Sequence, residues 1–597
     1  MKPTRHITTA PRGVAAVLIV LLLSACVTAG DDTDTTTGTV PDGCQEVSIA
    51  TSPEKFTLLT RLAETFNSTG QEFDGQCAAI TVNRVSSGVA ARMLAEGWPV
   101  DGSAGPAPVL WSPAASSWGA VVNQRLAEAG QPAIANDFQR IMVTPLVLGM
   151  PRPMAEALGW PEAEIGWSDI LSLAEDPEGW GALGRPEWGQ FRLGKTNPNF
   201  STSGLSATAA IYYAATGKTS GLTEADLADP QVIEFVRGVE AATVHYGDTT
   251  LTFLDNMYRA DQAGRGLTYA SAVAVEEVSI IAYNRGDPAD TGTPGPPPQV
   301  PLVAIYPREG TLYSDNPAYI LDAPWVNEVA RQAATAFRSF VIDDPDNQRA
   351  VLEFGFRPGN PSVAIGDPIN AANGLNPSKP DTELALPSPA VLSALIESWE
   401  ANRKTARIIM LLDVSGSMAD LAGEGYSKLE LAKEAVLSSL DEFKPEDEIG
   451  LWVFSTYLNG DDDYLELISP APLSEIRAEL EATVRNLVPE GGTGLYDSTR
   501  AAVEAVRAGF DPAKINAVLL LTDGMCDDDP PGCELDPLMD FLGSSERDVV
   551  RVFPVAYGQD ASIEELTAIA TASQARLYQA TNPLTIRQVF QQVISNF

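Results

Sequence analysis

The stretch that decides the fold of the C-terminal third is Arg407-Ile-Ile-Met-Leu-Leu-Asp413-Val-Ser415-Gly-Ser417. An apolar run of strand length, 408–412, is followed by oxygen-bearing side chains at alternate positions. A run without polar interruptions predicts a strand that is buried on both faces, as in a parallel sheet covered by helices. Ligands of such sheets bind at the carboxyl ends of the strands, so Asp413 and the two serines are candidate binding residues.

Strand-like and helix-like segments alternate from there to the C-terminus. The helical segments place apolar residues at a helical period, and the strand segments are short apolar runs. We expect strands at 407–412, 449–454, 465–468, 517–521 and 549–557, and helices at 428–443, 474–487, 496–508, 563–572 and 586–594. The alternation predicts a doubly wound α/β domain over residues 405–597.

Two further loops of this domain carry oxygen-bearing side chains. Thr493 lies in the glycine-rich turn Gly-Gly-Thr-Gly between two helices, and Asp523 follows the apolar strand at 517–521. With Asp413, Ser415 and Ser417 they make two carboxylates and three hydroxyls at one edge of the sheet. Such an oxygen-only set leaves room for water and suits Mg²⁺, with Mn²⁺ or Ca²⁺ as alternatives.

Taken one at a time, these motifs have simpler explanations, because Asp-x-Ser-x-Ser can cap a helix and Thr-Asp-Gly can form a turn. Their order and spacing together resemble the metal-ion-dependent adhesion site of the von Willebrand factor A (vWA) domain. The resemblance covers residues 405–597. It implies that Asp413, Ser415, Ser417, Thr493 and Asp523 bind a divalent cation, and that a carboxylate of a protein partner completes its coordination.

The N-terminus resembles a bacterial lipoprotein signal. Basic residues precede an apolar run at 14–23, which is too short to cross a bilayer as a helix of about 20 residues. The run ends in Leu23-Ser-Ala-Cys26, which resembles a lipobox. We expect removal of residues 1–25, lipidation of Cys26, and anchoring at the extracytoplasmic face of the cell membrane, with 26–45 as a flexible tether. Ordinary secretion is the alternative.

The remaining cysteines agree with export. Cys44 and Cys77 lie near one end of the chain, and Cys526 and Cys533 near the other. Of the three possible pairings, Cys44–Cys77 and Cys526–Cys533 keep each disulfide within one expected domain.

Composition limits the function. The chain has 597 residues, a net charge of −40 and two histidines. Its acidic residues are spread over both halves, which argues against nucleic acid as a partner. Since His6 lies in the signal, His245 alone remains, and neither a zinc site nor a histidine-dependent nucleophile relay is expected. We therefore expect a binding protein rather than an enzyme.

Residues 46–370 also alternate between strands and helices. We expect strands at 47–50, 80–82 and 108–112, and helices at 53–67, 89–96 and 205–216. The stretches 109–113, 197–204, 275–283, 302–319 and 337–358 make this region similar to bacterial extracellular solute-binding proteins, the two-lobed periplasmic-binding type 2 proteins. By this resemblance a small solute or ion lies between the lobes and is touched by Ser86, Ser87, Ser112, Ser201, Thr202, Ser203 and Glu276.

The class of solute stays open at this point. Hydroxyls at 201–203 before a helix favour an anion, although each serine could equally be a helix cap. Glu276 and Glu277 oppose an oxyanion and favour a cation or a polar organic solute.

The overall prediction is an α/β protein in which a two-lobed domain is followed, after a proline-rich linker at 371–404, by the vWA domain. We expect a membrane-anchored binding protein whose vWA domain engages a protein partner through its metal. The alternatives are the substrate receptor of an ABC-type importer with an accessory vWA domain, a vWA-assisted hydrolase, and a first domain that has lost its ligand and serves as a scaffold.

Overall fold

The computed structural model describes residues 36–37, 40–99, 104–423, 425–527, 533–544 and 549–597. The expected signal segment, Cys26 and most of the tether lie outside these residues. Within the described part of the chain, no helix is both long and apolar enough to span a membrane.

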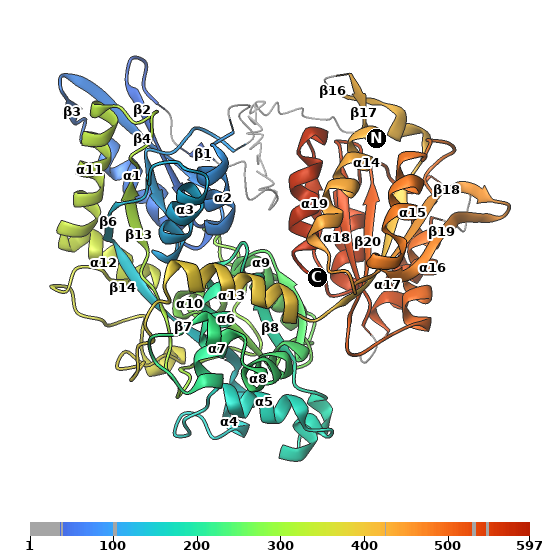
Figure 1. The fold of residues 1–597 in the computed structure, drawn as a ribbon, viewed down its shortest axis with the longest axis horizontal. Coiled ribbons are helices and arrows are strands. Elements are labelled where there is room, and N and C mark those ends of the chain that lie inside the picture. The colour runs from blue at the N-terminus through green and yellow to red at the C-terminus, as the bar shows by residue number, and fades with distance from the viewer. Residues whose placement is uncertain (1–35, 38–39, 100–103, 424, 528–532, 545–548) are drawn as a thin grey trace, which may run out of the picture. The chain divides into compact units, whose positions relative to one another are not determined.

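The first lobe of the N-terminal domain is a sheet with helices on both faces (Figure 1). Its strand order is β1-β4-β2-β5-β13-β6, with β3 added beside β4. The strands are β1 (Thr36–Thr37), β2 (Gln45–Thr51), β3 (Glu72–Phe73), β4 (Gln76–Arg84), β5 (Leu110–Ser112), β6 (Asp137–Arg140) and β13 (Pro317–Ile320). Because alternate side chains of a strand face opposite ways, Ile49 packs with α1 (Phe56–Ser68) and α11 (Glu328–Asp343), while Ala50 packs with α2 (Ser87–Glu96) and α3 (Ser117–Glu128).

The second lobe is built in the same way on a second sheet. Its order is β11-β7-β10-β8-β9, and two short strands also pair with β7. The strands are β7 (Met142–Pro151), β8 (Leu193–Thr196), β9 (Thr243–Gly247), β10 (Ala272–Glu276) and β11 (Leu302–Ile305), with β12 (Tyr313–Ser314) and β14 (Arg357–Pro358) beside β7. The helices that reach the cleft are α6 (Thr202–Thr216), α9 (Thr250–Gln262) and α10 (Glu277–Asn284).

The chain passes between the two lobes at neighbouring points. It leaves the first sheet after β6 and enters the second at β7, with Ile141 between them, and it returns between β12 and β13 through Asp315 and Asn316. Arg140 and Asp315 form an ion pair of 3.2 Å that joins these two crossings, and a third crossing leads from α12 (Pro345–Phe354) to β14. Short paired crossings of this kind are where lobes of such proteins hinge.

The segment expected as a linker is largely packed against helices of both lobes. Leu384 and the apolar face of α13 (Pro389–Asn402), including Leu392 and Leu395, are buried in the same core as α3 and α6. The segment therefore contributes to a hydrophobic core.

The C-terminal domain has a six-stranded sheet in the order β19-β18-β15-β20-β21-β22. The strands are β15 (Ala406–Asp413), β18 (Glu448–Asn459), β19 (Asp462–Pro472), β20 (Ile515–Thr522), β21 (Arg551–Tyr557) and β22 (Tyr578–Ala580). All neighbours are parallel except β18 and β19. This is the arrangement that the alternating segments predict.

The central strand β15 explains why the apolar run has no polar interruption. Ile408, Met410 and Leu412 pack on one face with α14 (Lys428–Ser439), α15 (Leu473–Arg485) and α19 (Ile586–Ile594). Ile409 and Leu411 pack on the other face with α16 (Leu495–Ala508), α17 (Leu535–Gly543) and α18 (Ile563–Ala572). Both faces are thus covered by helices, as the run predicts.

The expected strands and helices of this domain are confirmed, with some differences. The short paired strands β16 (Leu421–Gly423) and β17 (Tyr426–Ser427) were not predicted. The expected edge strand at 465–468 is the middle of the longer β19, which pairs antiparallel with β18. The short β22 and helix α17 have no counterpart in the predicted elements. A three-residue strand is too short to give a hydrophobic period.

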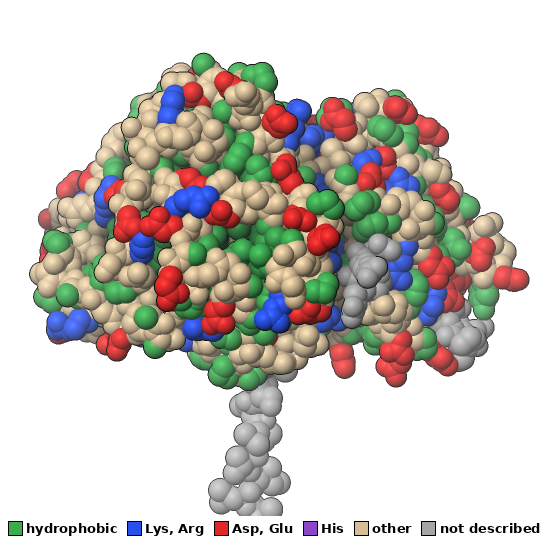
Figure 2. Space-filling view, turned by 90° about the horizontal axis from the view of Figure 1, so that it is seen from below, with side chains coloured by type: hydrophobic (Ala, Val, Ile, Leu, Met, Phe, Trp, Pro, Cys, Tyr) green, Lys and Arg blue, Asp and Glu red, His purple; other side chains and the backbone are tan. Residues whose placement is uncertain are grey.

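Both predicted disulfides, Cys44–Cys77 and Cys526–Cys533, are confirmed. Each joins residues of one domain. On the face drawn in Figure 2, acidic side chains are scattered and interspersed with Lys and Arg, so this face carries no single basic or acidic patch.

Candidate functional site

The five residues predicted to bind metal lie on three loops at one edge of the C-terminal sheet. β15 ends at Asp413 and β20 ends one residue before Asp523, and the two strands are parallel neighbours. Thr493 lies in the loop that precedes α16. Parallel strands bring their carboxyl ends to the same edge, so residues 110 positions apart in sequence meet there.

Hydrogen bonds join the three loops. The Ser417 hydroxyl donates to Asp523 Oδ1 at 2.7 Å, and the hydroxyl oxygens of Ser415 and Ser417 are 3.0 Å apart. The loop of Thr493 is tied to both others, because Gly416 N–H donates to the carbonyl of Gly491 and Asp527 N–H donates to that of Thr493, each at 2.9 Å. The structure therefore brings all five predicted residues together.

Burial of the two carboxylates gives this site its electrostatic character. Asp413 and Asp523 are fully buried. Asp413 Oδ1 accepts from Ser415 N–H at 2.7 Å, and its Oδ2 accepts from the Thr522 hydroxyl at 2.6 Å. Burial, with a smaller contribution from the charge of Asp523, raises the pKa of Asp413 to about 6. Burial and the charge of Asp523 both disfavour the ionised form of Asp413 when no cation lies beside it.

The donor set fits a small divalent cation. Among the described residues, no group of three or more His, Cys, Asp or Glu lies close enough together to hold a metal ion. Two carboxylates with three hydroxyls are instead the oxygen donors of a site that keeps water in its coordination shell, as Mg²⁺ does. Asp413, Ser415, Ser417, Thr493 and Asp523 would hold the ion, which would supply a positive charge for an anionic group of a partner.

One residue of this site was not predicted from the sequence. Lys428, the first residue of α14, donates from Nζ to Asp523 Oδ2 at 2.7 Å. It follows the Asp-x-Ser-x-Ser motif by 11 residues, but its sequence neighbours give only a helix start. Contact with Asp523, 95 positions away, is visible only in the fold.

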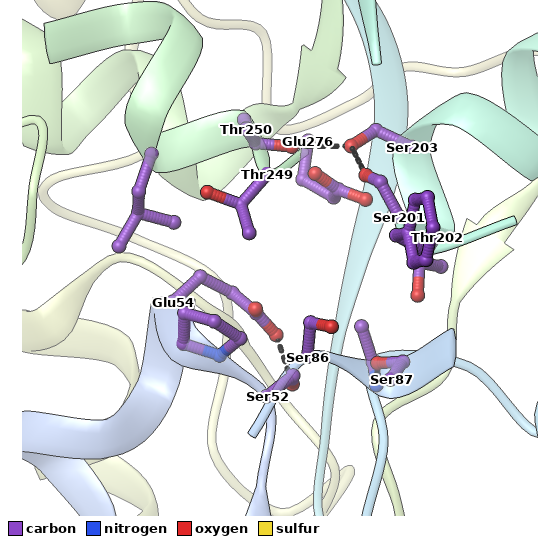
Figure 3. Close-up of a pocket in the computed structure, with 14 residues that line it drawn as sticks. Ser52, Glu54, Ser86, Ser87, Ser201, Thr202, Ser203, Thr249, Thr250 and Glu276 are labelled. Carbon is purple, nitrogen blue, oxygen red and sulfur yellow. Dashed lines mark hydrogen bonds between the residues drawn. The ribbon is translucent and has the colours of Figure 1, made fainter. Parts of the chain in front are cut away.

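The second candidate site is the cleft between the two lobes of the N-terminal domain (Figure 3). Side chains of both lobes point into a cavity of about 20 Å³. This volume has room for a group about the size of one water molecule. The polar residues that line it are Ser52, Glu54, Ser86, Ser87, Ser201, Thr202, Ser203, Thr249, Thr250 and Glu276.

Helix N-termini explain why so many hydroxyls meet there. Ser86, Ser201, Thr249 and Glu276 are the N-cap residues of α2, α6, α9 and α10. Of these four, only Thr249 accepts a hydrogen bond from its own helix. The other three side chains are therefore not used as caps.

Six of the seven residues predicted to touch solute line this cavity. The exception is Ser112, which ends β5. Ser112 is fully buried, and its hydroxyl has no hydrogen-bond partner among the described residues. Ser52, Glu54, Thr249 and Thr250 line the cavity but were not predicted, although their helix-capping pattern resembles that of the serines that were.

The structure separates the two neighbouring glutamates. Glu277 is paired with Arg357, at 2.8 Å to both carboxylate oxygens, and also receives the hydroxyl of Tyr306. It therefore does not add charge to the cleft. Glu276 is nearly fully buried in the cavity wall, and burial, with the nearby charge of Glu54, raises its pKa to about 7.

The remaining histidine is structural. His245 is fully buried, with ring nitrogens bonded to the carbonyl of Tyr246 and the hydroxyl of Tyr269. Burial lowers its pKa to about 3. His245 is not among the residues that line the cleft.

Comparison with known proteins assigns each half of the chain separately. A family model described as bacterial extracellular solute-binding protein matches residues 47–357, and one described as von Willebrand factor type A domain matches residues 408–525. The second match contains all five predicted metal residues and Lys428.

Curated relatives match only part of the chain. The inter-alpha-trypsin inhibitor heavy chain H3 of Rattus norvegicus is 24% identical over 197 residues, which is 32% of this chain and 21% of that protein. The heavy chain H4 of Bos taurus is 25% identical over 201 residues, which is 32% of this chain and 20% of that protein. The chain thus spans about a fifth of the length of these relatives.

Solved structures with similarity fall into the same two groups. A periplasmic thiamin binding protein is 13% identical with a TM-score of 0.40, over 61% of this chain and 99% of that one. A von Willebrand factor type A protein from Catenulispora acidiphila is 21% identical with a TM-score of 0.25, over 32% of this chain and 42% of that one. The family matches identify the chain more firmly than these scores do. Since residues 47–357 are more than half of its 597 residues, the chain belongs to the bacterial extracellular solute-binding proteins and carries a vWA domain at its C-terminal end.

Proposed function

We propose that this chain is a lipid-anchored, non-enzymatic binding protein on the extracytoplasmic face of the membrane, whose vWA domain holds Mg²⁺ and engages a protein partner through it. The observation that carries this proposal is the meeting of Asp413, Ser415, Ser417 and Asp523 through direct hydrogen bonds, with Thr493 on a loop tied to them.

The donor set gives the partner its chemistry. A divalent cation held by two carboxylates and neutral hydroxyls keeps positions filled by water. An acidic side chain of a partner gains charge-assisted contact by replacing that water. Membership in the solute-binding family supports an extracytoplasmic location, and the lipobox at Cys26 supports the anchor.

A second function is favoured by the cleft, namely reception of a small solute for an ABC-type importer. Three N-cap side chains that do not cap their own helices line an enclosed cavity. Serine and threonine hydroxyls offer donors there, and Glu54 and Glu276 offer acceptors. No Lys, Arg or His is among the lining residues, so the cleft suits a cation or a small polar solute better than an oxyanion.

The proposed function is tested on membranes that carry the full-length chain. After chemical crosslinking in Mg²⁺, partners should be recovered with the wild-type chain and lost with EDTA or in Asp413→Ala. EDTA should leave the chain itself on the membrane, whereas Cys26→Ala should release it to the soluble fraction. Recovery of the same partners with Asp413→Ala would refute the metal-dependent contact, and retention of Cys26→Ala would refute the lipid anchor.

A further inference from the structure

A lysine ammonium already occupies the carboxylate cluster of the vWA domain. Lys428 Nζ lies 2.7 Å from Asp523 Oδ2, and its side chain is only 8% exposed. The other oxygen of that carboxylate receives the Ser417 hydroxyl at 2.7 Å. Both oxygens of Asp523 are therefore engaged by this chain's own groups.

The backbone of Lys428 is held from several sides. Ser427 and Glu430 form a capping box that fixes the start of α14 one residue before Lys428. Lys428 N–H donates to the Asp420 carbonyl at 2.9 Å, and the Tyr557 hydroxyl donates to the Lys428 carbonyl at 2.9 Å. The ammonium is thus placed by the fold. The Lys428 side chain is mostly buried where it meets Asp523, so it is not a mobile surface side chain.

Among the described residues, Lys428 forms an ion pair with one other acidic side chain. Asp560 Oδ2 lies 3.8 Å from Nζ, but Asp560 is 81% exposed and its charge is screened by water. Asp523 is fully buried, so its attraction for the ammonium is far less screened. The buried pair decides where the ammonium lies.

The charge of the site depends on this pair. Asp413 and Asp523 contribute two negative charges, and Asp413 is bonded to an N–H and a hydroxyl, not to a cation, among the described residues. With Lys428 the net charge of the three groups is −1, and without Lys428 it is −2. A divalent ion therefore leaves +1 in the present site and would leave a neutral site if the lysine charge were removed.

We propose that Lys428 is the resident counter-ion of the metal site. It stabilises the two buried carboxylates when no metal is bound, and it lowers the affinity of the site for divalent cations. The positive charge that remains after metal binding is then available for the acidic group of a partner. This inference rests on the proposed metal site and adds what sets its affinity.

The test compares Lys428→Met, which keeps the length of the side chain without its charge, with the wild-type full-length chain. Calorimetric titration with MgCl₂ should show affinity roughly tenfold higher or more in Lys428→Met, because a like charge next to the ion has been removed. Without metal the variant should unfold at a lower temperature, and Mg²⁺ should raise its unfolding temperature by more than it raises that of the wild type.

Control variants separate charge from structure. Lys433→Met, on the same helix with Nζ bonded to the Arg485 carbonyl, should titrate like the wild type. Lys428→Arg keeps the charge and should also stay near wild-type affinity. Lys428→Gln, which loses the charge but keeps a donor, should bind more tightly and serves if Lys428→Met does not fold.

Two outcomes are distinguishable. Metal binding by the wild type with no gain, or a loss, in folded Lys428→Met and Lys428→Gln overturns the counter-ion role alone. Absence of Mg²⁺ binding by the wild type overturns the proposed metal site, and with it this inference.

Discussion

Glu276 is the residue of the cleft whose protonation is most affected by its surroundings. It is fully enclosed between the lobes, and burial together with the charge of Glu54 raises its pKa to about 7. Lys55 is also fully buried and interacts electrostatically with Glu276. Its Nζ donates to the Pro113 carbonyl and to Asn316 Oδ1. Burial and the charge of Glu54 favour the neutral carboxyl group of Glu276 at mildly acidic pH, whereas the Lys55 ammonium opposes this.

This raised pKa predicts a pH-dependent stability. A pKa that is higher in the folded state than the ordinary 4.5 gives stability that is complete below pH 4.5 and is lost as the pH rises through about 7. The loss is of the order of 3 kcal/mol, at about 1.4 kcal/mol for each pKa unit. Glu276→Gln, which stays neutral, should unfold at a higher temperature than the wild type at pH 8 and at a similar temperature at pH 4.5.

Scanning calorimetry of the full-length chain across this pH range measures the difference. Glu234→Gln, at an exposed position of α8 (Pro230–Ala241), is the matched control and should leave the pH profile unchanged. A Glu276→Gln profile parallel to that of the wild type would contradict the assignment of a raised pKa.

At the residue scale, the sequence predicts site residues that follow one another in a recognisable order and spacing. Asp413, Ser415 and Ser417 lie at alternate positions, and Thr493 and Asp523 follow in the expected order, so the candidate metal site could be predicted as a set. Lys428 could not, because a lysine at a helix start is common and its contact depends on where α14 lies. Asp497, one helical turn after Thr493, is exposed on α16.

At the scale of elements, α2 and the loop before α6 meet across the cleft. Gly88 N–H donates to the Phe200 carbonyl at 3.0 Å, and Trp118 Nε1 donates to Thr202 Oγ1 at 2.8 Å. A Cβ at Gly88 would lie 2.1 Å from the Asn199 carbonyl oxygen, which is far closer than atoms can approach. Glycine at this position permits the two lobes to close.

Gly88→Ala should therefore hold the lobes apart without unfolding them. Alanine is favourable inside a helix by up to about 1 kcal/mol, so α2 itself should be stabilised. Small-angle X-ray scattering should show a larger radius of gyration than for the wild type, and any solute found by calorimetry should bind more weakly. Gly366→Ala, where an added Cβ meets no atom within 4 Å, is the control. Scattering identical to that of the wild type would show that this contact does not limit closure.

The elements that the sequence predicts well are those with a long apolar pattern. The run before Asp413 is buried on both faces of its sheet, and this alone fixes its identity as a central strand. Strands of two or three residues, such as β12 and β22, are defined by pairing with distant partners and have no pattern of their own. Buried Leu392 shows in the same way that a proline-rich stretch can end in a packed helix.

For the whole molecule, the two candidate sites lie in different domains of one chain. The solute-binding family accounts for residues 47–357 and the vWA match for residues 408–525. Neither match has a histidine among its candidate site residues. The two-domain order could be predicted from the sequence, whereas the chemistry of the cleft required the positions of Glu276 and Glu277.

The central claim is that Asp413 and its neighbours form a metal site, and direct titration of the purified full-length chain with MgCl₂ tests it. We predict binding of one divalent cation in the vWA domain that is weakened at least about tenfold in Asp413→Ala, since a coordinating carboxylate is lost. Asp497→Ala, which removes an exposed carboxylate on α16, should bind like the wild type. Equal affinities of the wild type and Asp413→Ala, or no binding by either, would contradict the account.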